Sequence, residues 1–338
     1  MKPTTVMAFS LLAVALGGRG VKPQATPSPA LIALSKTDMT LAIVDPATLK
    51  VVARVPSGPD PHEVIASTDG RFAYISNYGG GAYNTLTPVD LAKHEALPVI
   101  DLGALRGPHG LTFVGGKVWF TAEAAKAIGS YDPATKQIDV VLGTGQNRTH
   151  MIFVSNDLKR IITTNVSSAT VTMIDKTAGG GRGGRGGPPQ ADWNETVIAV
   201  GRGSEGFDVT PDGHEIWVAN AQDGTISIID AASKQVTRTL AAGVNGANRL
   251  KFTPDGKLAF VSALSGTALT IFDVAGRREV KRLPIGRGAA GIEMQPDGRR
   301  AYVACTPDNY VVVIDVPTLS EAGRIDVGRA PDGLAWVR

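Results

Sequence analysis

Three of the five histidines in this sequence of 338 residues stand in short motifs of the same form: HEV at His62, HGL at His109 and HMI at His150. Four later segments of this form carry another residue in place of the histidine. Imidazole and carboxylate side chains gathered in one cluster can exchange protons with a bound molecule, or hold a transition-metal ion. In chain order the seven aligned residues are His62, His109, His150, Glu205, Asn248, Ala290 and Asp332.

Proton transfer on an organic molecule is the first interpretation of this set. A histidine beside a carboxylate can serve as general acid and base in lactone hydrolysis or in a carbon–oxygen lyase reaction, and arginine can hold an anionic substrate. The predicted catalytic residues are His150, Glu205 and His109. The predicted substrate-binding residues are His62, Arg148, Arg249, Asn248, Asp332 and Glu123.

Metal binding is a second interpretation. Three imidazoles with an open coordination position form a catalytic rather than a structural ligand set, so His62, His109 and His150 could hold Zn²⁺ or a similar divalent ion. A third interpretation is a polar lining without chemistry. A divalent metal is the one cofactor that the sequence indicates, because it has no haem, nucleotide or flavin motif, no G-x-S-x-G and no H-E-x-x-H.

A repeat along the chain sets the spacing of these positions. An apolar run closed by aspartate recurs seven times, and each repeat holds about four short alternating runs separated by D-G, D-P or P-D-G turns. Four strands in a unit of about 40 to 45 residues are typical of a β-propeller blade. The closing aspartates, at spacings of 45, 42, 43, 55, 43 and 42 residues, are Asp45, Asp90, Asp132, Asp175, Asp230, Asp273 and Asp315.

The sequence therefore predicts an all-β fold, a seven-bladed β-propeller of four-stranded antiparallel blades. The last segment, PDGLAWVR, reads as an innermost strand, and the run from Ala30 to Val55 supplies three strands that lack one. Together they complete the seventh blade and close the ring, which removes an open sheet edge. Residues 30–338 are thus predicted to be one domain, with the seven aligned residues ringing the mouth of its central channel.

The N-terminal residues have the order of a secretory signal. Lys2 precedes an apolar run over residues 6–16 that is too short to span a membrane. We expect a signal peptide over residues 1–22, a Pro-rich linker over 23–29 and a periplasmic or secreted bacterial protein.

One repeat is longer than the others, because it contains the segment AGGGRGGRGGPPQ at 178–190. We expect a flexible surface loop inserted in an outer hairpin, the alternative being an Arg-Gly nucleic-acid segment. The chain carries 34 basic and 31 acidic residues, a balance that gives no indication of a nucleic acid or membrane partner. The lone Cys305 has no partner in the chain with which to form a disulfide. Separately, we expect the protein to be a monomer.

Residues that end the second strand of their repeats could form a further layer around the ring. Asparagine recurs there as Asn77, Asn165 and Asn220, which favours hydrogen bonding within the sheet as its role. Tyr78 adjoins the first of them, and Glu123 is aligned in place of the asparagine in the repeat of His109. Cys305, in the same register, is expected to be a buried, inert thiol.

The chain resembles the YVTN-repeat seven-bladed propellers, a mostly bacterial and archaeal group. Its versions of the signature are YISN at Asn77, ITTN at Asn165, WVAN at Asn220 and YVAC at Cys305, joined to three PDG turns. The resemblance covers residues 30–338. It implies the fold and leaves the chemistry to the site.

Shorter stretches are similar to two enzyme families. RTHM, SEGFDV and NRLKFTPDG resemble the His, Glu and Arg segments of the phosphogluconolactonase and muconate-lactonising propellers, and PHG at His109 resembles streptogramin lyases. The leading hypothesis is an exported propeller that binds a small anionic organic ligand at the channel mouth, with lactonase or lyase activity. The alternatives are a non-catalytic binding or cell-envelope module with a protein partner on its blade faces, and a metal-binding propeller.

Overall fold

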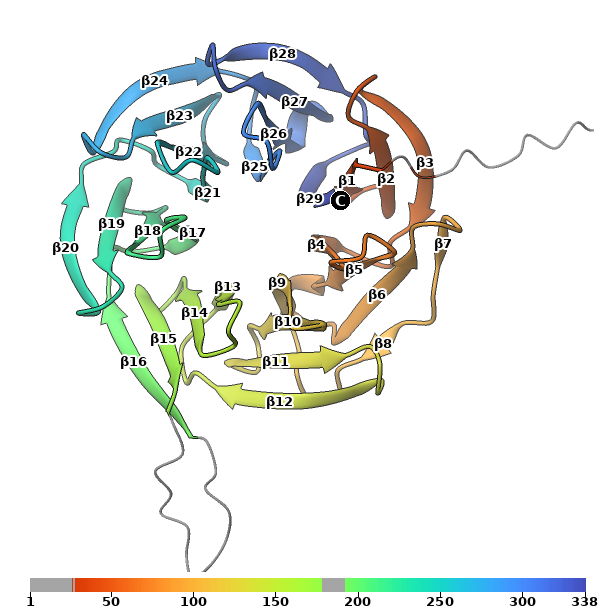
Figure 1. Ribbon diagram of the computed structural model, residues 1–338, viewed down its shortest axis with the longest axis horizontal. Helices are drawn as coiled ribbons and strands as arrows, with labels where there is room; N and C mark the ends of the chain where they lie inside the picture. Colours follow the sequence, from red (N-terminus) through yellow and green to blue (C-terminus); the bar gives the residue numbers. More distant parts are fainter. Residues whose placement is uncertain (1–25, 27, 178–191) are drawn as a thin grey trace, which may run out of the picture.

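In the computed structural model, the described residues are 26, 28–177 and 192–338. They form seven antiparallel sheets arranged as blades around a central channel, with no α-helix among them (Figure 1). The predicted all-β, seven-bladed propeller is confirmed. The expected signal peptide and the inserted segment 178–190 lie outside the described residues. Within those residues, no helix has the length and apolar character needed to cross a bilayer.

The burial of each strand explains the sequence pattern. Middle strands such as β2 (Thr40–Asp45) lie between two neighbouring blades and are buried on both faces, so they read as continuous apolar runs. Ile32 and Ile43 of one blade, for example, pack in one cluster with Val64 and Ile75 of the next. The outer strand β12 (Gln137–Gly143) alternates between exposed and half-buried residues because one of its faces meets solvent.

The strands of the first four blades follow one another from the axis outward. They are β29 (Pro331–Val337), β1 (Ala30–Ser35), β2 (Thr40–Asp45) and β3 (Lys50–Pro56); β4 (Pro61–Ala66), β5 (Phe72–Asn77), β6 (Thr85–Asp90), and β7 (Glu95–Ala96) with β8 (Ile100–Asp101); β9 (Pro108–Val114), β10 (Lys117–Ala122), β11 (Ala127–Asp132) and β12 (Gln137–Gly143); and β13 (Thr149–Val154), β14 (Arg160–Asn165), β15 (Thr170–Lys176) and β16 (Trp193–Ala199).

The remaining three blades have the same order. They are β17 (Ser204–Val209), β18 (Glu215–Asn220), β19 (Thr225–Asp230) and β20 (Gln235–Leu240); β21 (Ala247–Phe252), β22 (Leu258–Ala263), β23 (Ala268–Asp273) and β24 (Arg278–Pro284); and β25 (Ala289–Met294), β26 (Arg300–Cys305), β27 (Tyr310–Asp315) and β28 (Ser320–Ile325). Two short 3₁₀ turns lie at Gly79–Gly81 and Thr306–Asp308.

Strands from both ends of the chain share one blade. The C-terminal β29 pairs antiparallel with β1, with Leu31 opposite Trp336 and Ala33 opposite Leu334. The ring is therefore closed by main-chain hydrogen bonds, as the terminal segments predict.

The blade that begins with β4 departs from the four-strand pattern. Its outer strand is divided into β7 and β8, which both pair with β6. Pro88 lies in the middle of β6 and has no N–H to donate, and Pro98 interrupts the outer chain. The break leaves an irregular edge far from the channel.

Candidate functional site

The seven residues aligned in the sequence occupy one structural position. Each is the second residue of its innermost strand, and all seven line a single cavity of about 530 Å³ at one end of the channel. Because every innermost strand begins at this end, the repeat brings residues from positions 62 to 332 into one ring (Figure 1).

A second ring surrounds the first and is built by the residue that follows each second strand. In every blade the backbone N–H of this residue donates to the carbonyl just before the innermost strand, for instance Glu123 to Gly107 at 2.9 Å and Tyr78 to Asp60 at 3.1 Å. Four polar members of this ring, Thr306, Lys36, Tyr78 and Glu123, stand in consecutive blades. In chain order from the closing blade the ring is Lys36, Tyr78, Glu123, Val166, Ala221, Leu264 and Thr306.

The position of Glu123 corrects one detail of the sequence alignment. Ala122 pairs with Pro108 as Asn77 pairs with Pro61, so Ala122 holds the asparagine position of its blade. Glu123 lies one residue further on and is the counterpart of Tyr78. The alignment was wrong by one residue because F-T-A-E and Y-I-S-N look alike while their strands end at different letters.

The recurring asparagines act within the sheets. Asn77 donates to the carbonyl of Ser57 at 3.0 Å and accepts from Thr87 at 2.8 Å. Asn220 donates to Ser227 at 2.9 Å. Cys305 is buried, and burial raises the pKa of its thiol to about 12, so the residue is an unreactive thiol.

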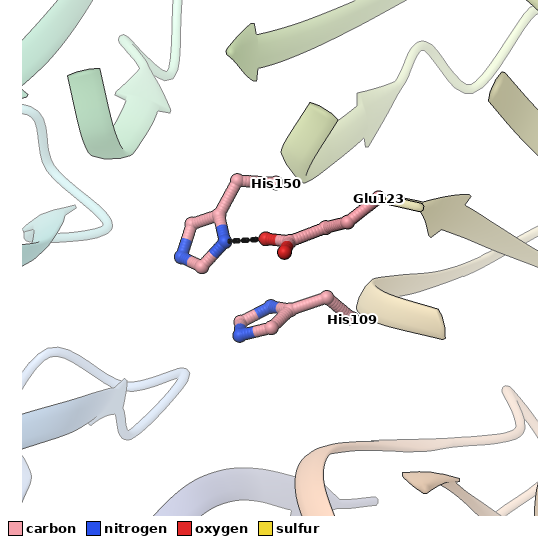
Figure 2. A group of neighbouring side chains, drawn as sticks. All are labelled: His109, Glu123 and His150. Atoms are coloured by element: carbon pink, nitrogen blue, oxygen red, sulfur yellow. Dashed lines mark hydrogen bonds and ion pairs between the residues drawn. The ribbon is translucent and has the colours of Figure 1, made fainter. Parts of the chain in front are cut away.

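His150 stands at the centre of the polar side of the mouth. Its side chain is 3% exposed, and its Nδ1 shares a hydrogen bond with Glu123 (Figure 2). Its Nε2 lies 2.8 Å from Glu205 Oε2, close enough for a strong ionic contact, although the atoms are not aligned for a hydrogen bond. Burial disfavours the imidazolium, but the charge of Glu205 and the bond to Glu123 outweigh it and raise the pKa of His150.

Glu123 and Glu205 are held as carboxylates. The Tyr78 hydroxyl donates to Glu123 Oε2 at 2.5 Å, and Arg148 Nε lies 3.6 Å from the same oxygen. Burial alone would raise the pKa of Glu205, but His150 and Arg148 reverse the shift and lower it to about 2. The pKa of Glu123 is lowered too, since hydrogen bonds from His150 and Tyr78 outweigh its burial.

Arg148 reaches over the mouth from a backbone position of positive φ, which Asp60 and Ala330 share in two other blades. It directly precedes the innermost strand β13 with φ of 55°, where the neighbouring blades have Gly107 and Gly203 in the same left-handed region. A non-glycine residue there is strained. Its side chain is 44% exposed, and Nη1 lies 3.8 Å from Glu205 Oε1. The guanidinium thus faces both the carboxylates and the open cavity.

His109 lies against His150, and its pKa is shifted in the opposite direction. The ring centroids are 3.8 Å apart, and the buried Nδ1 of His109 has no hydrogen-bond partner among the described residues. Burial and the neighbouring His150 hold the pKa of His109 well below its usual range. The pKa values of the two adjacent imidazoles are therefore shifted in opposite directions: the surroundings of His150 favour its charged form, and those of His109 favour its neutral form.

His62 belongs to a separate group on the same side of the mouth. Lys36 Nζ lies 2.8 Å from His62 Nε2, and Asp332 Oδ2 lies 3.2 Å from His62 Nδ1. Lys36 also pairs with Asp332 at 3.3 Å. Lys36 was not identified from the sequence, although its position after the second strand of the first blade could have revealed it.

Arg249 and Asn248 come from β21. Both line the cavity, but the Arg249 guanidinium is 7% exposed and forms an ion pair with Glu63. Glu63 follows His62 directly and was not singled out in the sequence. Arg249 is thus largely occupied, which leaves Arg148 as the more exposed arginine at the mouth.

The residues whose positions could hold a metal ion differ from the three histidines predicted from the sequence. His109, Glu123 and His150 each offer one ligand atom, and these atoms all lie within 4.8 Å of one another (Figure 2). The nitrogens of His62 are instead engaged by Lys36 and Asp332.

A larger hollow of about 650 Å³ lies elsewhere, at the irregular outer edge between two blades. Its walls include Tyr74, Leu97, Pro98 and Tyr131, with Asp101 and Lys136 among the few charged groups. Size alone does not make this hollow the functional site, because it gathers no cluster of histidines and carboxylates like that of the mouth.

Comparisons with known proteins support the fold. No protein-family model matches the chain, and no curated protein matches it. The structure is similar to a functionally unknown protein from Desulfotomaculum acetoxidans (TM-score 0.75, 12% identity, covering 91% of this chain and 99% of that chain). It is similar to the "putative 6-phosphogluconolactonase" of Bacteroides uniformis (TM-score 0.73, 16% identity, 91% and 99%) and to hydrazine synthase of Kuenenia stuttgartiensis (TM-score 0.70, 19% identity, 89% and 99%). At these identities the likeness shows a shared β-propeller fold, the class to which this chain belongs.

Proposed function

We propose that the channel mouth binds a small organic anion and catalyses proton transfer on it, opening a lactone or eliminating across a carbon–oxygen bond. The observation that carries this proposal is the pair of adjacent imidazoles, His109 and His150, whose pKa values are shifted in opposite directions at one cavity. Such a pair supplies an acid and a base at the same pH.

Each residue has a role in this proposal. His150, charged between Glu123 and Glu205, is the general acid, and neutral His109 is the general base. In hydrolysis, His109 takes a proton from water as the water oxygen attacks the lactone carbonyl. The ring C–O bond breaks, and His150 gives its proton to the leaving oxygen. In elimination, the base takes a carbon-bound proton instead.

The remaining groups around the cavity suit an anionic ligand of modest size. Arg148 can pair with a carboxylate or phosphate of the ligand, and Lys36 lines the same cavity. Leu264 and Ala290 on the opposite wall offer apolar contact to its carbon skeleton. The lactonase names of some structural neighbours agree with this chemistry by analogy of fold alone.

The test is a lactone hydrolysis assay by acid release, with 6-phosphogluconolactone and unphosphorylated gluconolactone as probes. We expect faster hydrolysis of the phosphorylated lactone with the protein than without it, and loss of that acceleration in His150→Gln. The exposed-histidine variant His214→Ala is the matched control and should keep wild-type rates. Calorimetry with 6-phosphogluconate measures binding separately. Binding without turnover of either lactone would overturn the lactonase form of the proposal, and absence of both would overturn the ligand site.

We also propose export, supported by the sequence pattern of residues 1–22. The N-terminal mass of the protein recovered from the periplasm of an export-competent host tests it. Recovery of only full-length protein from the cytoplasm contradicts it.

A further inference from the structure

Three ligand-type side chains converge at the polar side of the mouth. His109, Glu123 and His150 are between 3% and 5% exposed and come from two neighbouring blades. One ligand atom of each lies within 4.8 Å of the others (Figure 2). Two imidazoles and one glutamate are the protein ligands of a group of hydrolytic zinc sites, where the remaining positions are open to water and substrate.

The hydrogen-bonding of these rings is incomplete without a further partner. Among the described residues, His109 Nδ1 is fully buried and accepts or donates no hydrogen bond. A buried polar atom left without a partner costs about 1 to 3 kcal/mol. A metal ion bound at this nitrogen would remove that cost.

The charge of the mouth also favours a cation. When the histidines are neutral, the carboxylates in the network of ion pairs around the mouth exceed the cationic groups by two. The carboxylates are those of Asp60, Glu63, Glu123, Glu205 and Asp332, and the cationic groups are those of Lys36, Arg148 and Arg249. One divalent ion balances this excess, and it prepares the cavity for an organic anion.

We propose that His109, Glu123 and His150 form a binding site for a divalent transition-metal ion of the zinc class. The ion takes the place of the proton between His150 Nδ1 and Glu123, and that proton leaves to solvent. Tyr78, which donates to the other oxygen of Glu123, holds the carboxylate in position. His109 and His150 line the cavity, so water and a ligand there could complete the coordination, and the ion could then polarise a carbonyl oxygen and activate water in place of the His109 base.

The experiment uses the full chain, purified without a metal-affinity tag and dialysed against chelator. Titration with Co²⁺ followed by visible absorption, and with Zn²⁺ by calorimetry, should give one ion per chain. Glu123→Gln preserves the shape of the side chain but removes its charge, and it should weaken binding of Co²⁺ at least about tenfold. His109→Phe, which keeps a ring in the buried position, should remove one of the two imidazole ligands and so change the Co²⁺ spectrum and weaken Co²⁺ binding.

Two further variants separate this ligand set from other histidine sites. His62→Ala should bind Co²⁺ with an affinity within about threefold of wild type, and so should the exposed-residue control His214→Ala. Loss of binding in His62→Ala with binding retained in Glu123→Gln would overturn the proposed ligand set. A stoichiometry below one ion per chain, or an equal Co²⁺ affinity in all folded variants, would show an adventitious ion only and overturn the site.

Metal binding and lactone chemistry can fail separately, because the titration needs no organic ligand. One ion per chain with no hydrolysis of either lactone supports the metal site and contradicts the lactonase proposal. Hydrolysis by the chelator-treated protein without bound ion supports the acid–base proposal and shows that catalysis does not need the ion, while the titration alone decides whether the metal site exists.

Discussion

Two sides of the same mouth are built from equivalent positions but carry different chemistry. On the histidine side, the blades beginning with β4, β9 and β13 contribute His62, His109 and His150. On the opposite side, the blades beginning with β21 and β25 contribute Asn248 and Ala290 at the same positions.

The second ring follows the same division. Tyr78 and Glu123 belong to the histidine side, and Leu264 and Thr306 belong to the opposite side. The backbone arrangement is repeated, so the difference arises from side chains alone. The histidine side holds the hydrogen-bonded and charged groups, and the opposite side supplies the wall of a cavity. The propeller repeat thus fixes the position of each side chain, while chemistry requires suitable side chains in consecutive blades.

The largest effect should come from replacing the centre of the histidine side. His150→Gln removes the proposed general acid and should lower kcat for lactone hydrolysis by about 10² to 10⁴-fold. Steady-state rates of acid release measure it, with His214→Ala as the control. A rate within threefold of wild type would show that His150 is not the acid.

Removing the carboxylate that holds His150 should cost stability as well as activity. Glu123→Ala leaves the buried His150 Nδ1 and the Tyr78 hydroxyl without their partner, so the free energy of unfolding should fall by about 1 to 3 kcal/mol. Glu123→Gln should lose less, because its amide still offers an oxygen. Urea unfolding of the two variants checks the order, and equal losses would argue against the hydrogen bonds as the cause.

Arg148→Gly should separate ligand binding from folding. Glycine fits the φ of 55° at this position, so the midpoint of urea unfolding should stay close to that of wild type. Loss of the guanidinium should weaken binding of 6-phosphogluconate about tenfold, the typical effect of one charge-assisted hydrogen bond. Arg106→Gly, an exposed arginine away from the cavity lining, serves as the control for calorimetry. Unchanged affinity in Arg148→Gly would remove this residue from the binding site.

A titratable group also lies along the opposite side, but deeper in the channel. Glu293 follows Ala290 by three residues in β25, and burial, with Asp208 adding to it and Lys251 opposing it, raises its pKa from 4.5 to about 7. The folded protein therefore binds more protons than the unfolded chain between these pH values, and stability should fall as the pH rises through this window.

Comparison with Glu293→Gln isolates this contribution from the histidines. The variant should lack the decrease, which we expect to be about 1 kcal/mol because the Glu293 side chain is only half-buried. Unfolding midpoints measured at pH 5 and pH 8 give the difference. The first pH lies near the acid end of the window, and the second lies about one unit above its alkaline end. An identical pH dependence in both proteins would contradict the raised pKa.

The smallest effect is expected at the wall of the opposite side. Leu264 is 51% exposed, so Leu264→Ala should change the free energy of unfolding by less than about 0.5 kcal/mol. It should raise KM for the phosphorylated lactone a few-fold with kcat unchanged, because apolar contact with the ligand contributes equally to ground and transition states. A fall in kcat as large as that of His150→Gln would erase the distinction between the two sides.

Much of this arrangement follows from the sequence. The spacing of the aspartate-closed runs predicts seven blades, and the motifs HEV, HGL and HMI predict that His62, His109 and His150 share one structural position. The pairing of β1 with β29 was likewise predictable, since each terminal segment lacks strands that the other supplies. The blades and the shared position of the histidines follow from a local pattern that recurs along the chain. The closure of the ring follows from the strands that each end of this repeated pattern lacks.

The partners of each ring residue could not be obtained in this way. Glu123 was aligned one residue from its true position, because the end of a strand depends on pairing with a neighbour. The occupation of Arg249 by Glu63 joins residues from distant blades.

The repeat pattern of the sequence therefore predicts the fold, the closure of the ring and the seven residues at the mouth. The contacts between blades show that the ligand atoms of Glu123 lie close to those of His109 and His150, and that the pKa values of the two imidazoles shift in opposite directions. The physical reason is that a repeat specifies backbone positions through local strand and turn propensities, whereas contacts and pKa values depend on distances between side chains from different blades.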